Sequence, residues 1–584
     1  ENQDSCPDME GLDPVRNYMN YSSDACQNNF TQGQDDYMEY IIENHHPGYL
    51  EHDIWYPNLY IDSINLGQDT DGDDIFNPGE SVNIRVNLGN YVGATAHDIF
   101  LTLSTEDNRI TIIDSTILFP DSLEANSTVF SYQDWFSVEA DLNASLGNIA
   151  CMINITSEDE EYPYQIEIPI QIRLSLNQFG FPTQNITTKS SPLITDMNGD
   201  LLSEIYFGAD DGKFYGYNSN GSILDGFPFD VGFDIRSSAA VGDIDNDGIV
   251  ELVFGSNQGK IHILNQNGDL EFSYYASGMI WGSPAISDLD NDGDLEIIFT
   301  TENTNNGDLY AIHHNGELVE GFPANIDEKM MVGPSVGDLE GDGLMDIVVV
   351  TWSKNIIALD AHGIIKSGFP FLSSKRFNSP ATLVDLDGNG TLEIIAGNDN
   401  GELHVLNYDG TEMIFFDSGD DIRGGIAVAD LNDDGSLELL FSGYDDMIHA
   451  WDPILNEEIE GWPIDMGDNS LSGPITVDLD NDGDLEVVSA TKTGSVFVIH
   501  HDGSFFSNFP MNILGIESTS TVDDIDNDGD YELVFCTTQG LHVIDIKTEK
   551  GDHGSWKMHR GNTGRTGLYE GSLLTIIPNN LIPE

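Results

Sequence analysis

An acidic nonapeptide that recurs at a nearly fixed spacing constrains the fold of this chain more than any other sequence feature. The repeat has the form D-x-D-x-D-G-x-x-E, and its copies begin at eight aspartates between residues 196 and 524. Successive copies are 47, 45, 50, 47, 45, 48 and 46 residues apart. A period in the forties accommodates four short strands, which is the size of one β-propeller blade. The sequence therefore predicts an all-β fold with a propeller over residues 177–567, of eight blades, or of seven if one terminal unit is incomplete.

Each copy of the repeat lies in a unit whose composition is typical of a blade. In the second unit, residues 237–242 are small or apolar, as an inner strand beside the crowded propeller axis requires. The acidic loop follows, and residues 252–255 and 261–264 read as two further strands separated by a turn at Asn257-Gln-Gly259. A glycine–aromatic–proline element closes most units, and proline suits an outer edge strand because such a strand can spare an amide. This element begins at Gly226, Gly321, Gly368 and Gly461.

The repeated loops carry the ligand pattern of a calcium site. Calcium prefers six to eight oxygen ligands at ~2.3–2.6 Å. Positions one, three and five of a tight loop direct carboxylates to one point, glycine at position six permits the turn, and position nine completes the shell. Four carboxylates within nine residues would repel one another without a cation, so a merely solvated acidic turn is the weaker interpretation. The predicted ligands are Asp196, Asn198, Asp200, Glu204, Asp243, Asp245, Asp247, Glu251, Asp288, Asp290, Asp292, Glu296, Asp338, Glu340, Asp342, Asp346, Asp385, Asp387, Asn389, Glu393, Asp430, Asn432, Asp434, Glu438, Asp478, Asp480, Asp482, Glu486, Asp524, Asp526, Asp528 and Glu532.

Four copies depart from the repeat. In the first, Asn198 stands at position three and Leu201 replaces the glycine, which makes this predicted site the weakest. The fourth copy has Glu340 at position three and ends in Asp346. Asparagine keeps an oxygen ligand but loses a charge, which should weaken binding. It replaces an aspartate in the fifth and sixth copies, at Asn389 and Asn432.

The region from about residue 177 to 567 resembles the FG-GAP/VCBS repeats of integrin-α-like propellers. The acidic loops, the Gly-Phe-Pro elements and the segment Trp556-Lys-Met-His-Arg-Gly-Asn at the end of the last unit carry this resemblance. It implies a calcium-loaded propeller with about eight ions. We expect these ions to stabilise the fold rather than to take part in catalysis.

Residues 57–176 form a second region with a different pattern. Apolar and polar residues alternate in runs such as Val82-Asn-Ile-Arg-Val86, without a helical period, which predicts an Ig-like β-sandwich. Asp69, Asp71, Asp73 and Glu80 occupy positions one, three, five and twelve of a twelve-residue calcium loop, although Asp74 stands where glycine is usual. We expect one further calcium ion at this loop. The alternative is a plain acidic turn.

The four cysteines fall into two groups. Cys6 and Cys26 lie near each other in a polar segment and can form one disulfide, which suits an oxidising compartment. Cys151 and Cys536 lie in apolar, strand-like runs, so we predict that they are buried free thiols.

Residues 1–56 contain the motifs Asn17-Tyr-Met-Asn-Tyr21 and Phe30-Thr-Gln-Gly-Gln34. With these motifs the segment resembles the C-terminal end of the catalytic domain of pappalysin-type zinc metalloproteases. The resemblance implies that Met19 is the Met-turn methionine beneath the zinc and that Tyr21 approaches the transition state. Thr31 and Gln34 also make a capping box, which predicts a short polar helix in an otherwise irregular segment.

The zinc-binding part of such an enzyme is missing from this sequence. No HExxH motif occurs among the 15 histidines, so this chain cannot bind a catalytic zinc ion in the way of that family. We expect the zinc helix in an upstream part of a longer precursor. The alternatives are that the segment is a vestige, or that its tyrosines and methionines form a small core stabilised by the disulfide.

The charge balance excludes several classes of partner. Lys and Arg total 20 against 102 Asp and Glu, a net charge of −82. Such a chain repels the phosphates of nucleic acids and of anionic membranes. No apolar run approaches the ~20 residues of a membrane span. We expect a secreted or cell-surface protein without membrane insertion.

Three functions fit these observations. The first is the C-terminal part of a secreted metalloprotease, in which the propeller and the sandwich recognise substrate or attach the enzyme to a surface. The second is a non-enzymatic adhesion or scaffold protein. The third, a polysaccharide-acting propeller enzyme, fits least because the carboxylates are committed to the loops. The expected partner is an extracellular protein or glycan, or the upstream catalytic domain. Residues 568–584 resemble in composition a linker to a sorting domain of type IX secretion.

Overall fold

The computed structural model describes residues 57–569, except 68, 71, 92–93, 120–121, 132–133, 158–163, 305 and 552–555. Two compact units divide the chain, Glu1–Leu174 and Ser175–Glu584, two residues before the predicted boundary at 176/177. All regular elements of the described residues are β-strands, and none of these residues forms a helix long and apolar enough to cross a membrane. The predicted helix, Met19, Tyr21 and the Cys6–Cys26 disulfide lie outside the described residues.

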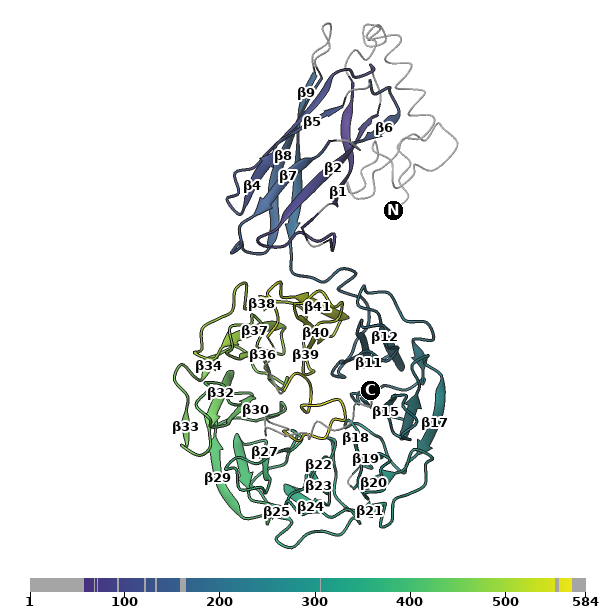
Figure 1. The fold of residues 1–584 in the computed structure, drawn as a ribbon, viewed down its shortest axis with the longest axis vertical. Coiled ribbons are helices and arrows are strands. Elements are labelled where there is room, and N and C mark those ends of the chain that lie inside the picture. Colours follow the sequence, from purple (N-terminus) through teal and green to yellow (C-terminus); the bar gives the residue numbers. More distant parts are fainter. Residues whose placement is uncertain are drawn as a thin grey trace, which may run out of the picture. The chain divides into compact units, whose positions relative to one another are not determined.

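The first unit is built from two antiparallel sheets (Figure 1). One has the strand order β1-β2-β7-β4, with β6 paired to β2, and the other has the order β5-β3-β8-β9. Burial alternates along β2, so that Val82, Ile84, Val86 and Leu88 point inward and share one hydrophobic core with Ile153 of the second sheet. The strands are β1 (Leu59–Gly67), β2 (Ser81–Asn90), β3 (Ile99–Ser104), β4 (Ile110–Asp114), β5 (Thr116–Phe119), β6 (Ser127–Phe130), β7 (Phe136–Ala140), β8 (Gly147–Ser157) and β9 (Tyr164–Leu174).

Eight antiparallel sheets follow one another around a ring in the second unit (Figure 1). From a three-residue inner strand outward, strands that are consecutive in the chain lie next to each other, except that β33 and β34 of the sixth sheet both pair with β32. The first four sheets contain β10 (Leu193–Thr195), β11 (Glu204–Gly208), β12 (Lys213–Tyr217) and β13 (Phe229–Asp230); β14 (Ala240–Gly242), β15 (Glu251–Ser256), β16 (Lys260–Leu264) and β17 (Leu270–Tyr275); β18 (Ala285–Ser287), β19 (Glu296–Thr300), β20 (Asp308–Ile312) and β21 (Ala324–Asn325); and β22 (Ser335–Gly337), β23 (Asp346–Val350), β24 (Asn355–Leu359) and β25 (Phe371–Leu372). The other four contain β26 (Thr382–Val384), β27 (Glu393–Gly397), β28 (Glu402–Leu406) and β29 (Glu412–Asp417); β30 (Ala427–Ala429), β31 (Glu438–Ser442), β32 (Met447–Asp452), β33 (Glu457–Glu458) and β34 (Ile464–Asp465); β35 (Ile475–Val477), β36 (Glu486–Ala490), β37 (Ser495–His500) and β38 (Met511–Asn512); and β39 (Thr521–Asp523), β40 (Glu532–Cys536) and β41 (Leu541–Asp545).

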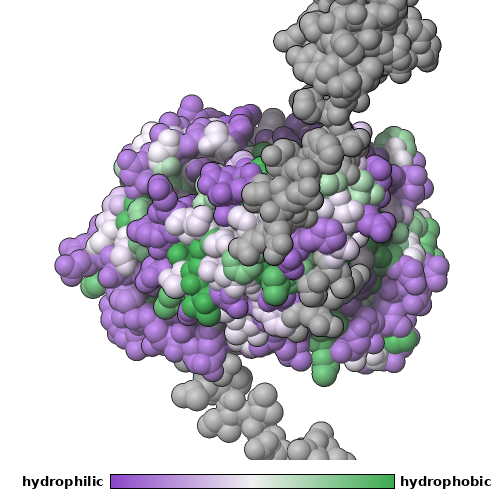
Figure 2. Space-filling view, turned by 90° about the horizontal axis from the view of Figure 1, so that it is seen from above, coloured by the Kyte–Doolittle hydropathy of each residue, from purple (hydrophilic) through white to green (hydrophobic). Residues whose placement is uncertain are grey.

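The second strand of each sheet is buried on both faces because neighbouring sheets pack against it from both sides. All five residues of β23 are buried, and Ile347 and Val349 share a hydrophobic cluster with Ile298 of the preceding sheet. A strand covered on both faces needs a continuous apolar run rather than an alternating one. Cys536, in β40, and Cys151, in β8, are buried free thiols, as predicted. The face in Figure 2 is mostly hydrophilic, with hydrophobic patches between the polar residues.

Each glycine–aromatic–proline element ends immediately before an outer strand. Pro228, for example, directly precedes Phe229, the first residue of β13. The sequence predicted this proline in the outer edge strand, and the structure places it just before the strand. The glycines are required because the next sheet approaches them closely. A Cβ on Gly226 would lie 1.9 Å from the carbonyl oxygen of Asn267, and Gly226 has a φ of +89°. An equivalent element that the sequence analysis did not single out ends at Pro510, before β38.

The two ends of the second unit close the ring. The segment before β10 pairs with β41 of the last sheet: the N–H of Gln178 donates to the carbonyl of Val543 at 3.0 Å, and Thr183 donates to Leu541 at 3.0 Å. The C-terminal segment Trp556–Leu568 lies in the centre of the ring (Figure 1). Its carbonyls accept N–H groups from six inner strands, namely β14, β18, β22, β26, β35 and β39.

Candidate metal centres

The eight acidic loops share one backbone conformation. Positions four and six of each loop adopt a left-handed φ, which is why glycine or asparagine is usual at these positions. Position six is glycine in seven loops, but Leu201 adopts φ 74° in the first. The pattern at position four is a structural feature that the sequence analysis did not single out. The residues at position four are Gly199, Asn246, Asn291, Gly341, Gly388, Asp433, Asn481 and Asn527.

The carboxylates at positions one and five hold the loop backbone. In the second loop, Oδ1 of Asp243 accepts the N–H of Asp247 at 3.0 Å and Oδ2 accepts that of Gly248 at 2.9 Å. Oδ1 of Asp247 in turn accepts the N–H of Ile249 at 2.8 Å. The loop is therefore fixed by its own side chains. Bonds from positions five and six to the position-one aspartate recur at Asp196, Asp338, Asp385 and Asp430.

The carboxylate at position nine lies buried beneath each loop and accepts a hydrogen bond from the loop backbone. In every loop one of its oxygens accepts the N–H of position two, at distances of 2.7 to 3.2 Å. These eight side chains belong to residues that are at most 3% exposed. They are Glu204, Glu251, Glu296, Asp346, Glu393, Glu438, Glu486 and Glu532.

The second oxygen of this carboxylate distinguishes the loops. Oε1 of Glu393, Glu438 and Glu532 is buried and has no hydrogen-bond partner among the described residues. Burial raises the pKa of Glu393 to about 7, that of Glu438 to about 8 and that of Glu532 to about 11. A buried, ionised oxygen without a partner is costly, and a bound cation removes that cost. The donor set therefore fits a hard divalent ion.

Several predicted ligands converge within the distance that one ion can bridge. Oxygens around a calcium ion at ~2.4 Å lie within about 4.8 Å of one another. Carboxylate atoms that all lie within 4.8 Å of one another come from positions one, three and nine in the second, fifth and seventh loops, and from positions one, five and nine in the first. Position five of the second and seventh loops, Asp247 and Asp482, is outside these groups, and Oδ1 of each accepts the N–H two residues on.

In the third and in the seventh loop, a histidine lies beside the position-nine carboxylate. Nδ1 of His313 lies 3.0 Å from Oε1 of Glu296, and Nδ1 of His500 lies 2.9 Å from Oε1 of Glu486. His313 forms one group with Asp290, Asp292 and Glu296. Neither histidine was predicted from the sequence. A signal was present: both loops read Asp-Leu-Asp-Asn-Asp-Gly-Asp-Leu-Glu, and each of these two units has a His-His pair at the end of its third strand.

In the fourth loop, the cation beside the carboxylates is a lysine. Nζ of Lys366 lies 2.7 Å from Oδ1 of Asp346 and 2.8 Å from Oε2 of Glu340. Burial raises the pKa of Asp346, and the Lys366 ammonium opposes this rise. The N–H of Lys366 donates to the carbonyl of Ala358. In four other sheets the same backbone bond is made by an apolar residue, namely Leu224, Val319, Ile459 and Phe506.

The first and eighth loops also have protein donors at their carboxylates. Nδ2 of Asn198 donates to Oε1 of Glu204 at 2.7 Å. In the eighth loop, the ammonium of Lys550 contacts Asp524, and Nε2 of Gln178 donates to Oδ2 of Asp526 at 2.6 Å. These donors compete with an ion for the same oxygens.

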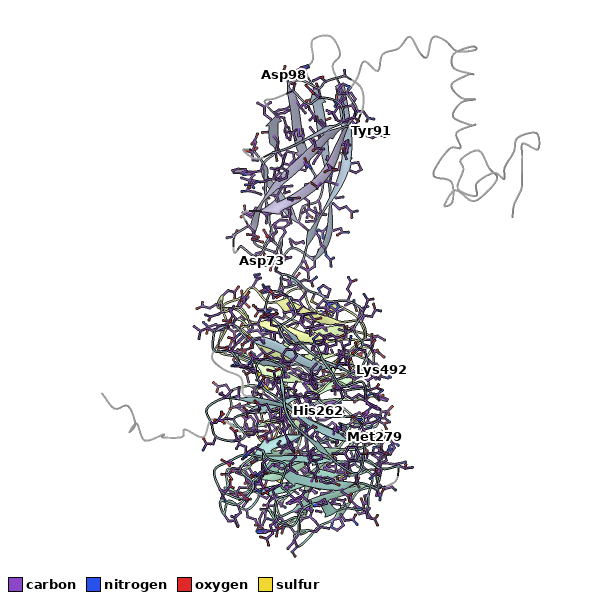
Figure 3. The ribbon with its side chains drawn as sticks, turned by 90° about the vertical axis from the view of Figure 1, so that its right-hand side faces the viewer. Asp73, Tyr91, Asp98, His262, Met279 and Lys492 are labelled. Carbon is purple, nitrogen blue, oxygen red and sulfur yellow. The ribbon has the colours of Figure 1, made fainter. Side chains whose placement is uncertain are left out.

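The loop of the first unit has the same backbone features. Gly72 and Asp74, at positions four and six, adopt φ of 91° and 62°. Glu80 is 6% exposed and accepts the N–H of Thr70 at 2.6 Å and that of Asn77 at 3.0 Å. Asp73 lies at one end of the sheets, opposite Tyr91 and Asp98 (Figure 3). The remaining predicted ligands are Asp69, whose Oδ2 accepts the N–H of Asp74, and Asp71, which lies outside the described residues.

These loops and sheets coincide with a known repeat family. Residues 243–299 and 288–349 match the FG-GAP-like repeat. The second unit resembles solved β-propellers: the crystal structure of the V. cholerae biofilm matrix protein Bap1 matches with a TM-score of 0.50 and 12% identity, and the match covers 67% of this chain and 94% of Bap1. At this identity the likeness concerns the fold alone.

Short segments of the chain match enzymes. An extracellular metalloprotease of Verticillium alfalfae is 66% identical over 32 residues, which are 6% of this chain and 12% of the relative. An extracellular metalloprotease of Pyricularia oryzae is 46% identical over 46 residues, 8% of this chain and 16% of the relative. The chain thus spans between about an eighth and a sixth of the length of these relatives.

Proposed function

We propose that this chain is the calcium-stabilised, non-catalytic part of a secreted zinc metalloprotease, and that its second unit serves recognition or surface attachment. The observation that carries the proposal is the set of buried position-nine carboxylates, three of which have an oxygen without a protein partner. The short matches to enzymes named extracellular metalloproteases support the link to proteolysis and to secretion. The zinc ligands would lie in a part of the protein upstream of this sequence.

The architecture that we propose has eight blades and an Ig-like sandwich. Each of the eight sheets of the ring corresponds to one blade, and the segment around Gln178 supplies the outer strand of the last. In the first unit, the orders β1-β2-β7-β4 and β3-β8-β9 correspond to the ABED and CFG sheets of an Ig constant-type domain, with β5 and β6 as additions. We propose calcium ions in the acidic loops other than the fourth, where Lys366 takes the place of the ion.

Metal content and proteolysis together test this proposal. We expect the 584-residue chain to bind several calcium ions per molecule, measured by mass spectrometry of the intact protein, and to bind no stoichiometric zinc. We expect the native protein purified from its source to contain one zinc ion and to cleave casein. A native protein without zinc or proteolysis would instead support the alternative, a non-enzymatic adhesion protein. A chain without bound calcium would contradict the stabilising role of the loops.

A further inference from the structure

A ring of eight side chains surrounds the axis of the second unit, at the end of the inner strands that is opposite to the acidic loops. Each member lies seven residues before the first aspartate of a loop, so each sheet contributes one. Trp281, for example, precedes β18, and Asp288 begins the loop after β18. The ring consists of Lys189, Arg236, Trp281, Met331, Asn378, Arg423, Leu471 and Glu517, and all eight line one cavity of about 150 Å³.

Smaller residues and the C-terminal segment complete this axial cavity. In seven of the eight sheets, the residue two positions later, still before the inner strand, is small and also lines the cavity, and His559 and Arg560 of the central segment line it too. The seven small residues form a second ring. The second ring contains Ser191, Ser238, Ser283, Gly333, Pro380, Gly425 and Thr519.

The lining of the axial cavity is richer in cations than the chain as a whole. Four of its lining residues are cationic, Lys189, Arg236, Arg423 and Arg560, and one is anionic, Glu517. The whole chain has 20 Lys and Arg against 102 Asp and Glu. Nζ of Lys189 lies 2.6 Å from Glu517. The carboxylates that hold the two ring arginines in place do not line the cavity. They are Asp210 and Asp234 for Arg236, and Asp399 and Asp421 for Arg423.

Hydroxyl donors line the cavity. Ser191 and Ser238 accept backbone N–H groups at their hydroxyl oxygens, which leaves their own O–H groups free to donate. Nε of Arg560 and Nε1 of Trp281 have no hydrogen-bond partner among the described residues, but both atoms are buried out of reach of a molecule in the cavity. A ligand rich in acceptors suits the hydroxyl and guanidinium groups of the lining.

We propose that the axial cavity binds a carboxylate-bearing sugar, the terminal uronic-acid residue of an acidic polysaccharide. Guanidinium groups bind carboxylates well, and the volume limits the occupant to about one sugar ring. Small hydroxyl-bearing walls beside an indole suit a hydroxylated ring better than an aliphatic peptide side chain. The proposal rests on the recognition role of the second unit proposed above and names its ligand class. It does not depend on proteolysis.

Calorimetry with uronic acids tests the proposal on the full chain in calcium. We expect D-glucuronate or D-galacturonate to bind with a Kd in the millimolar range or tighter, and glucose of the same ring size to bind at least ten-fold more weakly. Arg236→Gln should weaken uronate binding at least ten-fold, and Trp281→Phe, which replaces the indole of the lining by a smaller ring, should weaken it about three- to ten-fold. Lys213→Gln removes an exposed cation outside the cavity and should leave binding unchanged.

The outcomes separate this proposal from the proposed function. Absence of uronate binding, equal binding of glucose, or tighter binding of an acetylated peptide through its C-terminal carboxylate would each overturn it. Melting curves of both variants, recorded beside the calorimetry, show whether they are folded. Trp281→Phe keeps an aromatic side chain at this position, so it still tests the proposal if Arg236→Gln unfolds. Calcium content measured on the same samples stays at the wild-type value in either case, so a failure here leaves the calcium-stabilised recognition role standing.

Discussion

The fourth and fifth acidic loops have the same backbone but neutralise their buried carboxylates differently. In the fifth, Oε1 of Glu393 has no partner among the described residues. In the fourth, the shorter Asp346 meets the Lys366 ammonium at 2.7 Å. In the fourth loop Lys366 supplies positive charge at position nine, and we propose that a bound ion supplies it in the fifth. A lysine is always present, whereas an ion depends on the surrounding solution.

Removal of calcium should have the largest effect on stability, and the fourth and fifth loops should respond to it differently. At ~10 mM calcium and a Kd of ~10⁻⁴–10⁻³ M, each occupied site adds about 1.4–2.7 kcal/mol to the stability. Loss of several sites in EDTA should lower the melting temperature by many degrees in calorimetry. Hydrogen exchange should accelerate around Glu393 and change little around Asp346. An unchanged melting curve, or equal acceleration in both loops, would contradict the comparison.

Substitution of each position-nine carboxylate by its amide should have the next largest effect. Asp346→Asn leaves Lys366 without its buried partner and should destabilise the second unit by about 3 kcal/mol, with or without calcium. Glu393→Gln should cost about 1.4–2.7 kcal/mol in calcium and almost nothing in EDTA. Denaturant unfolding in both buffers measures these differences. A calcium-dependent effect of Asp346→Asn would show that the lysine does not replace the ion.

Conversion of the fourth loop to the pattern of the others should add one ion. The double variant Lys366→Leu with Asp346→Glu restores the apolar residue found at Leu224 and the longer carboxylate found at Glu393. We expect one more calcium ion per chain by mass spectrometry and a stability gain of about 1.4 kcal/mol on calcium addition. The single variant Lys366→Leu is the control. A double variant with the calcium content of the wild type would refute the idea that Lys366 excludes the ion.

Relief of the strained position six should have the smallest effect. Leu201 has φ 74° in the first loop, where seven loops have glycine, and Leu201→Gly should stabilise the chain by about 0.5–1 kcal/mol. The reverse change in the second loop, Gly248→Leu, should destabilise it by about 1–2 kcal/mol. Both are measured by denaturant unfolding. Equal and opposite effects are not expected, because Gly248→Leu also perturbs the calcium ligands.

The repeat made the ring and the loops predictable, but contacts between distant residues were not. Position six and the carboxylates of positions one, three, five and nine follow from spacing within nine residues. Lys366 stands 20 residues after Asp346, and only the pairing of β23 with β24 and the turn after it bring them together. The ring of eight side chains around the axis could not be predicted for another reason. Its members lie at a regular position, seven residues before each loop, but Arg236, Trp281 and Glu517 share no chemical property, so the sequence shows no repeat there.

The central segment has a consequence for the order of assembly. Six inner strands donate N–H groups to residues 556–567, which are the last to be synthesised among the described part of the ring. Until these residues emerge, Arg565 cannot donate to the carbonyls of Ala239 and Pro192, and the earliest sheets lack their innermost partner. The earliest sheets therefore cannot complete their hydrogen bonds until this central segment has been synthesised.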